Sequence, residues 1–114
     1  MELITGTHLI IDISNIKDNS KLMYQNDSII IMDKIVDKYK LRVVNKAIHQ
    51  FEPYGVTGVY VLAESHLSIH TFVDERKVAM DLYTCSNTRD FSDIKEFIKS
   101  LYKECEIVFK VIER

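Results

Sequence analysis

The sequence has little of several residue types that mark particular protein classes. Its 114 residues include two cysteines, one proline, three glycines and no tryptophan. Two cysteines are too few for a disulfide scaffold, and the scarcity of glycine and proline excludes long flexible linkers. No apolar run approaches the roughly 18 residues that a membrane-spanning helix needs. We therefore expect a protein without a membrane partner.

Charge of one sign is not in excess either. The formal net charge is −2, from 15 basic and 17 acidic side chains, so the sequence has no basic footprint for nucleic acid. The first six residues lack the basic start and apolar stretch of a secretory signal. With so few cysteines, the simplest expectation is a reducing, cytoplasmic compartment.

What is present indicates one globular domain over residues 1–114. The chain is 46% hydrophobic and 28% charged, ordinary values for a globular protein with a single core. Apolar spacing predicts helices from Asp27 or Ser28 to about residue 40 and over residues 89–104, the second capped by Asp90. β-Branched and alternating runs predict six strands, at residues 8–13, 41–51, 58–63, 66–73, 77–85 and 105–112.

The predicted order is therefore β-α-β-β-β-β-α-β. Two amphipathic helices can cover only one face of a six-stranded sheet. We expect an α+β fold, a two-layer sandwich with a mostly antiparallel sheet and both helices on one face. The other face must be solvated or covered by a partner.

Reactive side chains concentrate in the segment ESHLSIHT, residues 64–71. In a strand, His66, Ser68 and His70 share one face with Phe72. The residues alone allow three interpretations. The segment is a solvated polar face, or a nucleophile paired with histidine, or a metal site of His66, His70 and His49, which lacks a clustered thiol or carboxylate.

The same segment resembles the processing site of the small prokaryotic S-adenosylmethionine decarboxylase proenzymes. Three further segments resemble that family in the family's own order: GTHL at residues 6–9, HQFEPYGVTG at residues 49–58 and AMDLYTC at residues 79–85. Similarity of pattern covers nearly the whole chain. The resemblance implies a two-layer α/β sandwich, which agrees with the element order above.

The resemblance implies that the chain cuts itself between Glu64 and Ser65, into residues 1–64 (the β chain) and 65–114 (the α chain). The Ser65 hydroxyl would attack the Glu64 carbonyl to give an ester. Loss of the Ser65 α-proton would then eliminate the Glu64 carboxylate, and the resulting dehydroalanine would hydrolyse to a pyruvoyl cofactor. That group forms a Schiff base with a substrate amine and accepts the electrons released by decarboxylation.

Further roles follow from the resemblance. His70 is expected to be the base in processing, because an imidazole exchanges protons near neutral pH. Cys85 is expected to protonate the product carbon, since a free thiol is mostly protonated at neutral pH. Thr57 stands where the family usually has serine and would hold the Glu64 carbonyl. Phe51 is expected to stack on the substrate's adenine.

One segment departs from the family pattern. After His70 and Thr71 the family usually continues with Trp-Pro-Glu, and here the residues are Phe72, Val73 and Asp74. Phe72 and Asp74 are thus expected at the substrate. Aspartate preserves the charge of a glutamate that contacts the ribose hydroxyls, but it reaches one methylene less.

Three hypotheses about function follow. The first is S-adenosylmethionine decarboxylation, which supplies the aminopropyl donor for spermidine. The second is the same chemistry on another amino acid, such as ornithine or arginine, which the changed segment motivates. The third is a regulatory relative that never cleaves. The resemblance also implies a homodimer with residues of both chains at each active site, and no metal.

Overall fold

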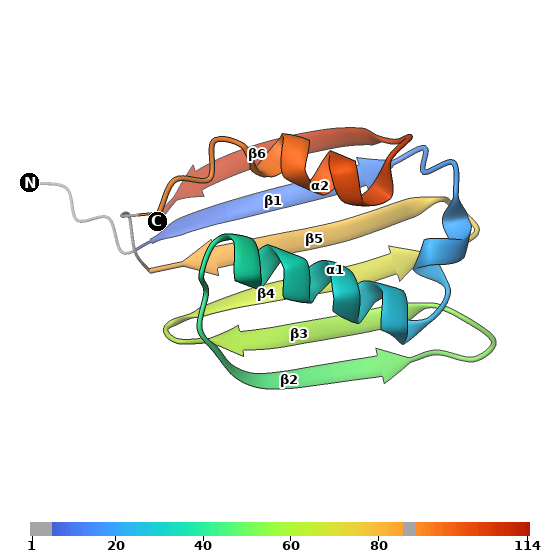
Figure 1. Ribbon diagram of the computed structural model, residues 1–114, viewed down its shortest axis with the longest axis horizontal. Helices are drawn as coiled ribbons and strands as arrows, with labels where there is room; N and C mark the ends of the chain where they lie inside the picture. Colours follow the sequence, from blue (N-terminus) through green and yellow to red (C-terminus); the bar gives the residue numbers. More distant parts are fainter. Residues whose placement is uncertain (1–5, 86–88) are drawn as a thin grey trace, which may run out of the picture.

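The computed structural model describes residues 6–85 and 89–114 (Figure 1). Six strands form one sheet in the order β2-β3-β4-β5-β1-β6, and all neighbours are antiparallel. In chain order the elements are β1 (Thr7–Ser14), a 3-10 helix (Asn19–Leu22), α1 (Gln25–Lys38), β2 (Val43–Gln50), β3 (Val56–Leu62), β4 (Ser65–Phe72), β5 (Lys77–Thr84), α2 (Ile94–Tyr102) and β6 (Glu106–Glu113). The predicted order and the two-layer α+β fold are confirmed.

The start of the first helix differs from the prediction. α1 begins at Gln25, so Asp27 and Ser28 lie in its first turn and not at its cap. The N-cap residue, Tyr24, makes no capping hydrogen bond with its side chain. The backbone N–H of Gln25 instead donates to the Gln50 side-chain oxygen at 2.6 Å. A residue of β2 thus satisfies the helix terminus, and this contact was not visible in the local sequence.

The second helix starts later than predicted, and the assignment of Asp90 as its cap is wrong. α2 begins at Ile94, while the Asp90 carboxylate accepts a hydrogen bond from the Ser92 N–H at 2.9 Å. The residues before α2 are used elsewhere. Arg89 donates to the backbone carbonyls of Tyr39 and Lys40, at 3.1 and 3.2 Å, and so ties this segment to the end of α1.

The core lies between the two helices and one face of the sheet (Figure 1). Alternate residues of the central strands point into it, and the largest fully buried side chains are Leu9, Ile11, Ile13, Ile16, Leu22, Met32, Ile35, Tyr60, Leu67, Ile69, Leu82 and Tyr102. Their period of two in strands and near 3.6 in helices is the pattern that a two-layer fold requires. Neither helix of the described chain is long and apolar enough to cross a membrane.

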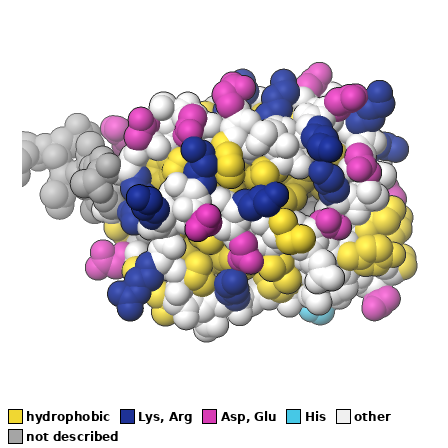
Figure 2. Space-filling view, in the orientation of Figure 1, with side chains coloured by type: hydrophobic (Ala, Val, Ile, Leu, Met, Phe, Trp, Pro, Cys, Tyr) yellow, Lys and Arg dark blue, Asp and Glu magenta, His cyan; other side chains and the backbone are white. Residues whose placement is uncertain are grey.

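The two sides of the molecule differ in character. On the helix side, Lys and Arg alternate with Asp and Glu over the surface, as Figure 2 shows. The face of the sheet away from the helices, here called the open face, carries no covering layer in the described chain. Val61, Val108 and Ile112 lie on it with 45–54% of each side chain exposed.

Candidate functional site

The predicted cleavage point lies in the tight turn between β3 and β4. Leu62 and Ser65 are paired across the two strands, so only Ala63 and Glu64 connect them. The Ala63 N–H donates to the backbone carbonyl of Arg42 at 3.0 Å, which fixes the turn against the start of β2. Ser65 is the first residue of β4 and is partly exposed. Its hydroxyl therefore stands at the edge of the core and not inside it.

Cys85 meets this turn from the neighbouring strand. The pairing of β4 with β5 sets His66 opposite Tyr83, so the residue just after β5 reaches the turn just before β4. The Cys85 backbone N–H donates to Ser65 Oγ at 3.4 Å, and its thiol donates to the carbonyl oxygen of Glu64. We call Glu64, Ser65 and Cys85 the cleavage half-site. Three residues that the sequence assigned to the same chemistry are in contact.

Thr57 and His70 meet at the other end of the sheet. They are paired across β3 and β4, and Thr57 Oγ1 lies 3.2 Å from His70 Nδ1. Because one of these atoms must donate, the contact fixes the orientation of the imidazole. Thr57 therefore contacts the predicted base, and not the Glu64 carbonyl of its own chain.

The predicted substrate-binding residues lie near this pair. Phe51 is 47% exposed and packs edge-on against His49, with ring centroids 4.5 Å apart. Phe72, at the end of β4, is also 47% exposed. Asp74 accepts a hydrogen bond from the Tyr54 hydroxyl at 2.6 Å, and this bond raises the pKa of Tyr54. We call Thr57 and His70, together with Phe51, Phe72 and Asp74, the histidine half-site.

The two half-sites are separated within one chain. Ser65 and His70 are five residues apart on one strand, which is about 17 Å at the rise of an extended chain. Ser65 shares its face with the buried Leu67 and Ile69, while His70 is exposed on the open face. In Figure 1 the turn before β4 and the end of β5 lie at one end of the sheet, and the ends of β2 and β4 lie at the other.

A polar cluster that the sequence did not predict lies on the open face across β1, β4 and β5, toward the sheet end that carries the cleavage half-site. His8 and His66 each place Nε2 on the same oxygen of Asp81, at 2.7 and 2.8 Å, and Ser68 donates to the other oxygen. Burial acts to raise the pKa of Asp81, but the three hydrogen bonds outweigh it and hold the pKa below its ordinary value. Asp81 is therefore a firmly ionised carboxylate.

These side chains also offer ligand atoms of the kind that a metal ion prefers. One nitrogen from each of His8 and His66 and one oxygen of Asp81 lie within 4.8 Å of one another. This set differs from the His66, His70 and His49 set considered from the sequence. The separations of 2.7 and 2.8 Å are those of hydrogen bonds. The Asp81 carboxylate and the two imidazoles therefore satisfy one another by hydrogen bonding.

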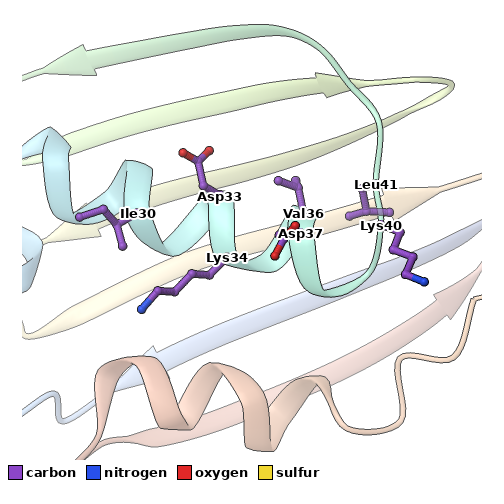
Figure 3. Close-up of a pocket in the computed structure, with 7 residues that line it drawn as sticks. All are labelled: Ile30, Asp33, Lys34, Val36, Asp37, Lys40 and Leu41. Carbon is purple, nitrogen blue, oxygen red and sulfur yellow. The ribbon is translucent and has the colours of Figure 1, made fainter.

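A hollow lies beside α1 (Figure 3). It is lined by Ile30, Asp33, Lys34, Val36, Asp37, Lys40 and Leu41. Asp33 is already engaged there, by the Tyr60 hydroxyl at 2.7 Å and the Lys46 ammonium at 3.1 Å. None of the residues that line the hollow belongs to either half-site.

Comparison with known proteins identifies the family. The model of the S-adenosylmethionine decarboxylase family matches residues 7–114. The chain is 33% identical over 114 residues to the S-adenosylmethionine decarboxylase proenzyme of Sulfurihydrogenibium sp. (strain YO3AOP1), an alignment that covers 100% of this chain and 85% of the relative. It is 35% identical over 88 residues to the proenzyme of Archaeoglobus fulgidus, covering 75% of this chain and 76% of the relative.

A solved structure agrees with the fold as well. The crystal structure of the adenosylmethionine decarboxylase from Aquifex aeolicus VF5 superimposes with a TM-score of 0.87 at 27% sequence identity. The superposition covers 99% of this chain and 92% of that one. The match of the family over residues 7–114, together with these relatives, shows that the chain belongs to the S-adenosylmethionine decarboxylase family.

Proposed function

We propose that this protein is a self-processing S-adenosylmethionine decarboxylase, with a pyruvoyl cofactor made from its own Ser65. The observation that carries the proposal is the contact between the Cys85 thiol and the carbonyl oxygen of Glu64, beside Ser65. It joins the bond to be cut and the predicted proton donor in one place. The residues present fit a pyruvoyl group at this position. Ser65 is partly exposed, and the Cys85 backbone nitrogen lies 3.4 Å from its Oγ.

Cleavage begins when Ser65 Oγ attacks the carbonyl carbon of Glu64. The attack puts negative charge on the carbonyl oxygen, and the Cys85 thiol donates a hydrogen bond to that oxygen. The peptide C–N bond breaks as the ester forms. Removal of the Ser65 α-proton by a base then releases the Glu64 carboxylate, and addition of water with loss of ammonia leaves the ketone.

The same thiol has a second task in decarboxylation. When formed, the pyruvoyl group supplies a carbonyl that withdraws electrons as carbon dioxide leaves the substrate. Cys85 is exposed and adjacent to that position. Its S–H is thus placed to deliver a proton to the product carbon, as the family resemblance implies.

A second copy of the chain completes the site in this proposal. His70 is the predicted base, yet it lies about 17 Å along β4 from Ser65 in its own chain. A two-fold dimer sets the same surface of both copies against itself, and when the axis runs across the strands, opposite ends of the two sheets meet. The open face, with its exposed Val61, Val108 and Ile112, is the surface that such a dimer would cover. The sheet end that carries the cleavage half-site would then lie opposite the partner's histidine half-site.

The substrate follows from the relatives and from the histidine half-site. The relatives quoted above are named for S-adenosylmethionine, so ornithine, arginine and a non-cleaving role are not favoured. Exposed Phe51 and Phe72 offer aromatic surfaces to an adenine, and Asp74 offers a carboxylate to ribose hydroxyls. The product would supply an aminopropyl donor for spermidine. Both described cysteines are free thiols, which fits a cytoplasmic setting.

Mass spectrometry of the purified protein tests the proposal. We expect two fragments, residues 1–64 and 65–114, the second lighter by one ammonia than simple hydrolysis would make it. Carbon dioxide release is then measured with S-adenosylmethionine, ornithine and arginine in parallel. A chain that stays whole after long incubation, or release from ornithine or arginine but not from S-adenosylmethionine, contradicts the proposal.

A further inference from the structure

Glu64 has an unusual backbone conformation. Its φ is +61°, in the left-handed region that glycine and asparagine occupy readily and other residues seldom. In that region the Cβ atom of an L-residue is crowded by neighbouring backbone atoms, which costs free energy. The residue in this unfavourable conformation is the one whose carbonyl group forms the bond predicted to break.

Three contacts hold Glu64 in this conformation. The pairing of Leu62 with Ser65 leaves the turn only two residues long. The Ala63 N–H is bound to the Arg42 carbonyl at 3.0 Å on one side, and the Glu64 carbonyl oxygen accepts the Cys85 thiol on the other. A strained backbone persists only where the surroundings determine it in this way, and such positions cluster at functional sites.

We infer that the left-handed conformation of Glu64 speeds self-cleavage, because breaking the Glu64–Ser65 peptide bond opens the turn that holds Glu64 in that conformation. The inference rests on the proposed function. The Ser65 Oγ–C bond forms, the C–N bond then breaks, the nitrogen takes up a proton, and the Glu64 acyl group remains attached through the ester oxygen. The φ of Glu64 is then no longer fixed by the turn.

The location separates Glu64 from other residues with positive φ. Asn15, Lys40, Arg76 and Lys103 also have φ between 51° and 64°, but none precedes the predicted cleavage point. Glycine would fit the turn without crowding, yet the sequence has glutamate there. A residue that fits the turn poorly is what a reaction driven by relief of crowding requires.

Substitutions at Glu64 test the inference, with cleavage followed by electrophoresis after pulsed cell-free synthesis. Glu64→Ala removes the carboxylate but retains Cβ, so it measures the effect of the side chain alone. Glu64→Gly removes the crowding, and Glu64→Asn reduces it. We expect Gly to cleave about 5- to 30-fold more slowly than Ala, which corresponds to the roughly 1–2 kcal/mol cost of a left-handed L-residue. Asn should fall between them.

A second measurement distinguishes relieved strain from lost rigidity. In the uncleavable Ser65→Ala chain, Glu64→Gly should melt at a higher temperature than Glu64→Ala if strain is released, and at a lower one if glycine merely loosens the turn. The matched control compares Lys103→Gly with Lys103→Ala, since Lys103 has φ of +64° between α2 and β6. That pair should cleave at equal rates.

The outcomes separate this inference from the proposed function. Slower cleavage of the Gly variant by threefold or more, with a higher melting temperature, supports it. A smaller difference, faster cleavage or a lower melting temperature overturns it. If the unaltered chain itself never cleaves, the proposed function fails first, and the melting comparison still decides whether Glu64 is strained.

Discussion

Ser65 and His70 stand on one strand, five residues apart, and their side chains lie on opposite faces of the sheet. The separation along β4 is about 17 Å. General-base catalysis requires heavy atoms within roughly 3 Å, or one bridging water. No rotation of side chains closes such a gap, so proton transfer between these residues requires two chains. Under the proposed function, the cleavage half-site of one chain would therefore have to meet the histidine half-site of another.

Mixed dimers provide the direct test of this arrangement. A Ser65→Ala chain and a His70→Ala chain should each remain uncut when made alone. When the two are made together in equal amounts, the His70→Ala chain should be cut in mixed dimers, because its Ser65 meets the intact His70 of the other chain. About half of the His70→Ala chains should then be cleaved. Electrophoresis with a tag on one chain measures this fraction.

The controls for this experiment are the separate chains, mixed only after folding. Efficient cleavage of His70→Ala by itself would show that His70 is not the base. An uncut mixture, despite mixed dimers on light scattering, would show that the two half-sites do not meet.

Cleavage should also depend on the open face. Val108 is 54% exposed on β6, with its side chain on that face. Val108→Lys places a charge in the predicted interface, so we expect monomers by light scattering and loss of cleavage with the fold retained. Ile30→Lys, at a residue 51% exposed on α1, is the matched control and should remain a cleaving dimer. A cleaving monomer of Val108→Lys would contradict the dimeric site.

Cys85 should affect both reactions, to different degrees. Cys85→Ser preserves a donor to the Glu64 carbonyl oxygen, so cleavage should stay within a few-fold of normal. Cys85→Ala removes this hydrogen bond and should slow cleavage by up to about tenfold. Both variants should slow decarboxylation by about 10²- to 10⁴-fold, the usual contribution of a positioned acid. Full decarboxylase activity in cleaved Cys85→Ala would refute the assignment.

Much of the fold was predictable because it depends on local periodicity. The apolar, β-branched run at residues 8–13 predicted a strand, and the helical spacing of Met32 and Ile35 predicted a helix. Leu9, Ile11 and Ile13 of that strand and both helical residues are buried. The helix starts were not predictable, because a side chain on β2 binds the first N–H of α1 and Arg89 holds the segment before α2. Long-range contacts thus overrode local capping signals.

The site was predictable in part. The five-residue spacing of Ser65 and His70 was visible in the sequence, and the strand predicted over residues 66–73 already implied that they lie far apart. The cluster on Asp81 was not visible, because it depends on β1 lying next to β5 in the sheet. Strand order of this kind is not encoded in any single segment. The only sign of this cluster in the sequence was the alternation of polar residues along each strand.

Thr57 should act through the imidazole that it contacts. Thr57→Val is similar in shape but cannot hydrogen-bond to His70 Nδ1, so cleavage should slow by about two- to tenfold, the worth of one ordinary hydrogen bond. Thr57→Ser restores the hydroxyl and should restore the rate. A shift in the pH profile of cleavage in the Val variant would show that the effect passes through His70. Equal rates and profiles in all three chains would show that the contact is dispensable.

Acid should destabilise the fold through Asp81. Its pKa is lower when folded than when unfolded, so its ionised form stabilises the protein above the unfolded pKa of about 3.9. This contribution is lost as the pH falls below that value toward the folded pKa. Asp81→Asn should therefore lower the free energy of unfolding by roughly 1–3 kcal/mol at pH 7, with a smaller difference at pH 3. Urea unfolding in the Ser65→Ala chain measures both values.

Asp12→Asn, at an exposed residue of the same face, is the control and should show no such change between the two pH values. An Asp81→Asn effect of equal size at pH 3 and pH 7 would mean that the carboxylate's charge is not what the two histidines and Ser68 stabilise.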